Sequence, residues 1–254
     1  MRTANWTDSV SVLDRVSAVF DAFGEEDEGL GVSELARRAN LPKSTVSRIA
    51  ADLVEQRFLD REGDRLYLGV RLFELGQTVQ QPRLLRRVAL PVMAELRDVT
   101  GQTVHLAVLD GGDVVFVAVV RGPASRPLVR IGSRLPAHAT AVGKAMLAFA
   151  PQSVVTAVTG RELTRRTSKT ITEASVLHRE FADIRRLGVA TEDEECTPGR
   201  ACAASPILSS GVLTPLAAIS VAGPAESLVP DRVAPAVRAA AMALSRRLST
   251  DPAG

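Results

Sequence analysis

The stretch LPKSTVSRIAADLVEQRF, residues 41–58, decides the fold of the first part of the chain. Proline suits the first turn of a helix, so Pro42 indicates where a helix begins. Apolar side chains then recur at helical spacing and predict a buried face made of Val46, Ile49, Ala50 and Leu53. The opposite face carries Ser44, Ser47, Arg48 and Ala51. The stretch therefore predicts a helix that packs on one side and presents short, hydrogen-bonding side chains on the other.

The flanking segments complete a known order of elements. Residues 9–23 and the stretch VSELARRAN, residues 32–40, repeat apolar side chains at helical spacing. FLDREGDRLYLG, residues 58–69, indicates a strand, a glycine-containing turn and a second strand. Three short helices followed by a hairpin are typical of a winged helix-turn-helix. A further helix is expected in VRLFELGQTVQQ, and QQPR, residues 80–83, is expected to be a linker.

The polar face of the Pro42 helix has the chemistry of a DNA contact. Hydroxyl groups bond phosphates and base edges, and arginine bonds guanine with two hydrogen bonds. A solvated surface helix is the alternative, but an arginine-bearing hairpin after it favours DNA. The residues expected at double-stranded DNA are Arg38, Lys43, Ser44, Thr45, Ser47, Arg48, Arg61 and Arg65. Residues 1–80 carry a net charge of −4, which predicts modest non-specific affinity.

The rest of the chain mixes strands and helices. TVHLAVLDGGDVVFVAVVRG, residues 103–122, predicts a hairpin that turns at DGGD. Two more strands are expected in residues 201–223. Helical patterns occupy LLRRVALPVMAELRDVTG, ATAVGKAMLAFA, SVLHREFADIRRLG and PDRVAPAVRAAAMALSRRL. This mixture predicts an α/β or α+β domain over residues 81–254, with a sheet packed on helices.

Composition excludes several classes of protein. The chain has 254 residues, of which 46% are hydrophobic, and no apolar run approaches the roughly 20 residues of a membrane span. The first residues lack the apolar segment of a secretion signal. Two cysteines, Cys196 and Cys202, do not make a disulfide framework. A cytoplasmic protein without a membrane partner is expected.

Enzyme motifs are incomplete in this sequence. The VGKA stretch lacks a phosphate loop because His138 stands where the first glycine belongs and Ala145 follows the lysine. No GxSxG elbow occurs, and the three histidines have no metal-ligand spacing. We therefore expect no catalytic residue, no metal and no cofactor.

The stretch from VSELARRAN to FELG, residues 32–76, resembles the DNA-binding domain of the isocitrate-lyase-regulator (IclR) family of bacterial transcription factors. GSRLPAHATAVGKAMLAF, GVATEDEECTPGRACAASPIL and AAISVAGP resemble the effector-binding domain of that family, in its order and spacing. The resemblance covers roughly residues 9–248 and implies an α+β protein with a GAF-like second domain.

The resemblance also implies an effector pocket for a small organic or aromatic acid. Its expected lining is Leu135, Thr140, Ala141, Val142, Gly143, Asp193, Glu194, Cys202 and Ser220. The small residues at 139–143 suit either an anion at a helix start or a helix packed tightly on a sheet. The acidic residues would repel an anionic effector unless they point outward or cap backbone groups. Ala222 stands where the family often has a small polar residue, which favours a less polar effector.

The expected function is a homodimeric or homotetrameric repressor or activator. It would bind a pseudo-palindromic operator through residues 1–80 and sense a small molecule through residues 81–254. Two alternatives remain: an enzyme fused to a DNA-binding domain, and a DNA-binding dimer whose second domain binds no ligand.

Overall fold

The structure is a computed structural model that describes residues 11–24, 27–123, 129–209 and 212–250. Its contacts divide the chain into two compact units, residues 1–80 and 81–254, and each unit is described by itself. No helix within the described ranges is long and apolar enough to cross a membrane.

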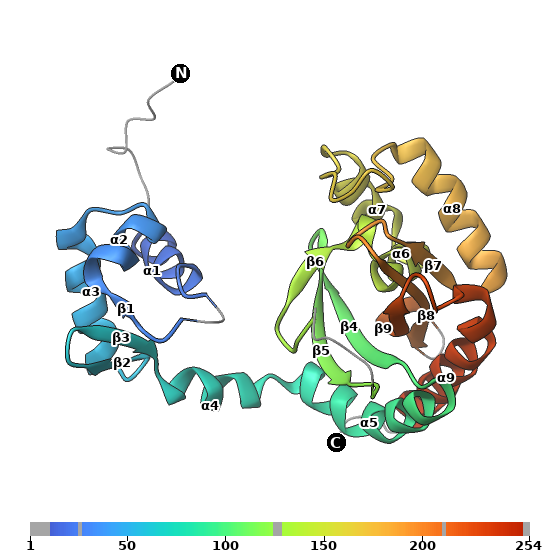
Figure 1. The fold of residues 1–254 in the computed structure, drawn as a ribbon, viewed down its shortest axis with the longest axis horizontal. Coiled ribbons are helices and arrows are strands. Elements are labelled where there is room, and N and C mark those ends of the chain that lie inside the picture. The colour runs from blue at the N-terminus through green and yellow to red at the C-terminus, as the bar shows by residue number, and fades with distance from the viewer. Residues whose placement is uncertain (1–10, 25–26, 124–128, 210–211, 251–254) are drawn as a thin grey trace. The chain divides into compact units, whose positions relative to one another are not determined.

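The first unit is a winged helix-turn-helix, as the sequence predicts. Three helices pack on a small sheet of order β1-β3-β2 (Figure 1). The helices are α1 (Val12–Asp21), α2 (Val32–Ala39) and α3 (Lys43–Glu55). The strands are β1 (Leu30–Gly31), β2 (Leu59–Glu62) and β3 (Arg65–Leu68). The core of this unit contains four α3 side chains, Val46, Ile49, Ala50 and Leu53. Asn40 ends α2 in the left-handed conformation (φ 52°), which its short polar side chain tolerates.

The segment expected to be a linker is helical. Helix α4 (Val70–Thr78) is followed by Val79, whose backbone is extended. Helix α5 (Gln80–Thr100) begins at the next residue. QQPR therefore forms the first turn of α5, so the linker prediction is wrong. Pro82 is compatible with this because amide groups of a first turn have no partner inside the helix.

The second unit is built on a six-stranded antiparallel sheet of order β6-β5-β4-β9-β8-β7. Its strands are β4 (Thr103–Asp110), β5 (Asp113–Val120), β6 (Arg134–Pro136), β7 (Ala190–Asp193), β8 (Arg200–Ser209) and β9 (Val212–Pro224). The expected hairpin is present, since Asp110 pairs with Asp113 across the two glycines. Strands β6 and β7 were not foreseen because both are short.

Helices cover both faces of this sheet (Figure 1). On one face, α5 and α9 (Pro230–Thr250) pack on alternate strand residues such as Leu106, Ile219 and Val221. On the other lie the 3-10 turn η1 (Ala137–Ala139), α6 (Ala141–Leu147), α7 (Gln152–Thr159) and α8 (Ala174–Leu187). Because side chains alternate along a strand, Thr103, His105 and Ala107 point to this second face. This second face carries the candidate pocket.

Candidate functional site

The exposed face of α3 is polar and unpaired. Lys43, Ser44, Ser47 and Arg48 are exposed, and none of them has a hydrogen bond or ion pair within the described part of the chain. Thr45 is half-buried and lies in a surface hollow with Leu41 and Asn40. The helix thus presents a cation and two hydroxyl groups beside Arg48, without intramolecular partners to displace.

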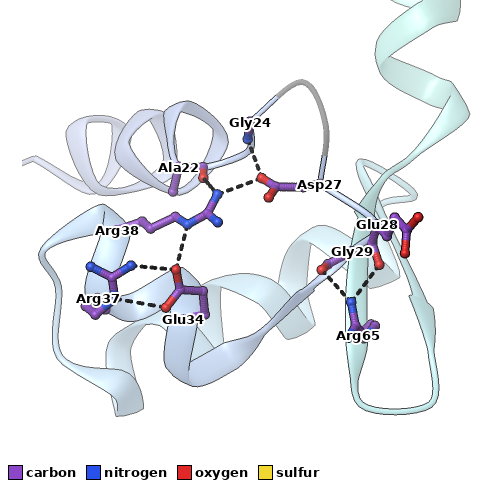
Figure 2. A network of polar contacts seen from close by, with 9 residues as sticks. All are labelled: Ala22, Gly24, Asp27, Glu28, Gly29, Glu34, Arg37, Arg38 and Arg65. Carbon is purple, nitrogen blue, oxygen red and sulfur yellow. Dashed lines mark hydrogen bonds and ion pairs between the residues drawn. The ribbon is translucent and has the colours of Figure 1, made fainter.

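Arg38 belongs instead to a polar network inside the first unit (Figure 2). Its guanidinium bonds Asp27 Oδ2 at 2.7 Å, Glu34 Oε1 at 2.8 Å and the Ala22 carbonyl at 3.3 Å. Arg37 reinforces this by bonding both oxygens of Glu34. Arg37 and Arg38 together lower the pKa of Glu34 to about 2. The network ties α1, the segment after it and α2 together.

Arg65 is likewise occupied. Its Nη1 donates to the carbonyl oxygens of Glu28 at 2.9 Å and of Gly29 at 3.2 Å, which joins β3 to the segment before β1 (Figure 2). Arg61 on the neighbouring strand is exposed and has no hydrogen bond to the described residues. Of the two hairpin arginines, Arg61 therefore has the free guanidinium.

The second unit contains a cavity between the sheet and the start of α6. Its unfilled space, part of it open to solvent, is about 670 Å³. The sheet floor is made of cross-strand neighbours, since His105 pairs with Ser220 and Ala222 pairs with both Thr103 and Cys202. The walls come from β5, the segment before β6, β6, the start of α6, the loop after β7 and β8. They include Phe116, Val119, Val129, Leu135, Thr140, Ala141, Val142, Cys196, Thr197 and Ala201.

Charged groups line the rim and one wall of the cavity. Arg121 is exposed and Arg200 is half-buried, and neither guanidinium has a hydrogen bond or ion pair among the described residues. Glu192 is buried, which raises the pKa of its carboxyl to about 7, and its Oε1 accepts from the Cys196 amide at 3.0 Å. Burial also raises the pKa of the Cys202 thiol to about 12. The cavity therefore offers two cations, a carboxyl that titrates near neutrality and an uncharged thiol.

A buried ion cluster stands behind the cavity wall. Lys144 on α6 is fully buried, and its Nζ lies 2.6 Å from Glu180 Oε1 on α8 and 2.7 Å from Glu195 Oε1 after β7. Breaking one member of such a cluster leaves a buried charge without compensation, at a cost of about 3–5 kcal/mol. The cluster therefore fixes α6 against the loop that carries Cys196 and Thr197.

Two family models match the chain. The IclR helix-turn-helix domain matches residues 12–63, and the bacterial transcriptional regulator IclR C-terminal domain matches residues 77–246. The chain belongs to the IclR family. It is therefore a DNA-binding transcriptional regulator with an effector-binding C-terminal domain.

Named relatives and solved structures agree with this. The transcriptional repressor IclR of Escherichia coli K12 is 32% identical over 237 residues, which cover 91% of this chain and 86% of the relative. The regulator KdgR of the same organism is 34% identical over 222 residues, 85% of this chain and 83% of the relative. The crystal structure of an IclR homologue from Microbacterium hydrocarbonoxydans, complexed with 4-hydroxybenzoate, superimposes with a TM-score of 0.84 at 31% identity, covering 94% of this chain and 100% of the other.

Six of the nine residues predicted for the effector pocket of this IclR-family regulator line the cavity: Leu135, Thr140, Ala141, Val142, Cys202 and Ser220. Gly143 does not line it. A Cβ atom at Gly143 would lie 2.1 Å from the Ala137 carbonyl oxygen, so this glycine allows α6 to approach η1. Its amide donates to the Thr140 hydroxyl at 3.1 Å. Tight packing accounts for Gly143, although the close neighbour is η1 and not the sheet that the sequence analysis considered.

Asp193 and Glu194 do not line the cavity either. Both carboxylates bind Lys169 Nζ, at 2.9 and 2.8 Å, and Glu194 Oε2 also accepts from the Gly199 amide. They stabilise the turn before β8 and are absent from the cavity lining, so the expectation that they line this cavity is wrong. Glu192, not Asp193, faces the cavity because side chains alternate along β7.

Several lining residues were missed from the sequence of this regulator: Thr103, His105, Phe116, Val119, Arg121, Glu192, Cys196, Thr197 and Arg200. The alternation of TVHLAV in β4 was a usable signal, because it places Thr103 and His105 on one face. No local pattern identifies Arg121 and Arg200, since only the strand order brings these two guanidinium groups to one cavity.

Proposed function

We propose that α3 reads the operator through Arg48, Ser44 and Ser47, with Lys43 on a phosphate. The support is the unpaired polar face of α3 described above. Arg61 would contact the DNA backbone beside it. Arg38 and Arg65 would act through the fold, because their guanidinium groups already bond within the domain. Thr45, half-buried, would contact at most a phosphate. Acting on bacterial DNA, the protein would work in the cytoplasm.

The effector is a small aromatic acid in this proposal. The observation that carries it is the pair of guanidinium groups, Arg121 and Arg200, which have no partner among the described residues and lie on a cavity whose other walls are largely apolar. Guanidinium groups bind carboxylates in a planar geometry, and Phe116 offers a ring for edge or stacking contacts. The relative solved with 4-hydroxybenzoate has a ligand of this class.

We infer that the protein binds its effector without converting it chemically. A nucleophilic cysteine needs a lowered pKa, whereas burial raises the pKa of Cys202 to about 12 and also raises that of Cys196. Effector recovered unchanged after prolonged incubation with the protein is the expected result.

Assembly into a homodimer would pair two DNA-binding units on a pseudo-palindromic operator. The support is the exposed apolar side chains of α4, of which Val70 and Phe73, three residues apart on the helix, are both more than half exposed. Exposed apolar patches on otherwise polar surfaces often mark interfaces. A tetramer built from such dimers is compatible with the same surface.

Calorimetric titration of the full chain with benzoate and its hydroxy derivatives tests the effector proposal. Arg200→Gln should weaken binding at least tenfold, because it removes a charged partner of the carboxylate. Arg179→Gln, on the exposed surface of α8, is the matched control. Equal affinity of wild type and Arg200→Gln would place the carboxylate elsewhere.

A further inference from the structure

His105 is a buried polar side chain in the floor of the effector cavity. Only 6% of the residue is exposed, and its cross-strand neighbours Val119 and Ser220 line the same cavity. The Phe116 ring packs edge-on against the imidazole, with ring centroids 5.5 Å apart and planes at 71°. The imidazole is therefore held in one place within the wall.

Two polar groups beside the cavity, Thr103 and Thr140, have hydrogen-bond partners, whereas the imidazole has none among the described residues. The Thr103 hydroxyl accepts from the Gly122 amide at 3.2 Å, and the Thr140 hydroxyl accepts from the Gly143 amide. His138, outside the cavity, bonds the Thr164 carbonyl through Nε2 at 3.0 Å. No hydrogen bond joins His105 to any described residue. Because His105 lines the cavity and its ring nitrogens are not among the fully enclosed unpaired atoms of the described residues, these nitrogens are open to the cavity and available to a ligand.

The charge state of His105 limits what that ligand group can be. Burial, and secondarily the charge of Arg200, lowers the pKa of His105 to about 4. The imidazole is therefore neutral at physiological pH and offers one donor and one acceptor. It does not compensate a carboxylate, for which Arg121 and Arg200 are available on the same cavity. A hydroxyl group, which both donates and accepts, fits a neutral imidazole.

We propose that His105 determines effector specificity by binding an uncharged hydroxyl group on the ring of the aromatic acid. The effector class is then a hydroxylated aromatic acid, with its carboxylate at the arginines and its hydroxyl at the sheet floor. This rests on the proposed function, which supplies the carboxylate end. A site built to bond a hydroxyl discriminates strongly against the analogue without it, because the buried polar group is then left unpaired.

Calorimetry on the full chain with benzoate and its 3- and 4-hydroxy derivatives tests the proposal. Wild type should bind at least one hydroxy derivative about tenfold or more tightly than benzoate. His105→Phe should abolish this preference, so that the hydroxy derivatives bind no more tightly than benzoate, while His105→Gln should retain part of it. His178→Phe is the matched control, because exposed His178 also packs edge-on against a phenylalanine, Phe181, but lies outside the cavity.

The outcomes separate the two proposals. If no acid binds wild type, the aromatic-acid proposal fails and the hydroxyl site fails with it. If benzoate and the hydroxy derivatives bind equally, only the hydroxyl site is overturned. Loss of benzoate binding in folded His105→Gln would show that the histidine contacts the carboxylate, which also overturns it. Imidazole ¹⁵N shifts of His105 that move with a hydroxy derivative but not with benzoate would support it.

Discussion

Arg48 and Lys43 are both exposed on α3, yet their replacement should have different effects. A bidentate base contact discriminates between sequences by about 1–3 kcal/mol, so Arg48→Ala should weaken operator binding and reduce specificity. Lys43→Ala should weaken all sequences alike and lower the salt slope by roughly one, because it removes one phosphate contact. Fluorescence anisotropy with operator and scrambled duplexes at several salt concentrations measures both. An Arg48→Ala protein with undiminished operator affinity would refute the assignment.

Glu192 should make effector binding depend on pH. Its pKa of about 7 means that the carboxyl becomes charged between about pH 6 and pH 8, facing an anionic effector. Affinity for an aromatic acid should therefore fall several-fold over this range. In Glu192→Gln it should stay nearly constant, since the pKa values of His105 and Cys202 lie far outside the range. A wild-type affinity that rises with pH would contradict this.

The raised pKa of Glu192 also makes the stability of the fold depend on pH. The folded-state pKa of Glu192 lies above its ordinary value of 4.5, so its contribution is fully present below about pH 4.5 and is lost as the pH rises through about 7. Thermal melts of wild type and Glu192→Gln should therefore diverge as the pH rises through that window, with the variant the more stable above pH 7.

Ala141 is a test of the cavity wall. It is 1% exposed and lines the cavity at the start of α6, so Ala141→Leu should fill the space and block the effector. Overpacking costs about 1–3 kcal/mol, and a melting curve shows whether the fold survives. Ser220→Ala should cost only about 0.5–1.5 kcal/mol of binding, on the order of one hydrogen bond. Ala150→Leu, half-buried outside the cavity, is the control. Wild-type affinity in a folded Ala141→Leu protein would place the pocket elsewhere.

At the scale of elements, α4 should decide the assembly state. Phe73 is 67% exposed, while Arg71 lies over the Phe58 ring at 5.1 Å and holds the helix to its own unit. Phe73→Glu should therefore dissociate the dimer without detaching α4. Glu74→Ala, on the same exposed helix, should leave it intact. Sedimentation equilibrium measures both, and a dimeric Phe73→Glu protein would exclude this surface as the interface.

The elements differ in how far the sequence predicts them. Helix α3 and the β4–β5 hairpin follow from local periodicity and turn residues, and the structure confirms both. Strand β7 does not, because four residues carry too little pattern. The resemblance assigned Asp193 and Glu194 to the pocket, whereas the alternation of β7 puts Glu192 there, because a one-residue shift along a strand reverses the face.

The candidate site was predictable only in part. The small residues that begin α6 stand together in the sequence and in space. The floor of the cavity comes from β4, β8 and β9, which are far apart in the chain, and their register decides that His105 lies beside Ser220. In the sequence, His105 is one of three scattered histidines. Its neighbours in space cannot be assigned without the order of the strands in the sheet.

At the scale of the whole molecule, helix α3 and the cavity belong to different units, so regulation of α3 by an effector in this cavity would require coupling between them. An effector that binds two states of the protein unequally shifts their populations, and coupling energies of this kind change affinity by about 5–150-fold. The reciprocal change in effector affinity on adding operator must have the same size.

An aromatic acid bound in the cavity should change the affinity of the protein for its operator. The decisive measurement is anisotropy of an operator duplex, selected from random DNA by this protein, with and without a saturating hydroxybenzoate. The operator dissociation constant of wild type should change at least about fivefold, and that of Ala141→Leu should not change. An acid that binds wild type by calorimetry but leaves the operator dissociation constant unaltered would contradict the account.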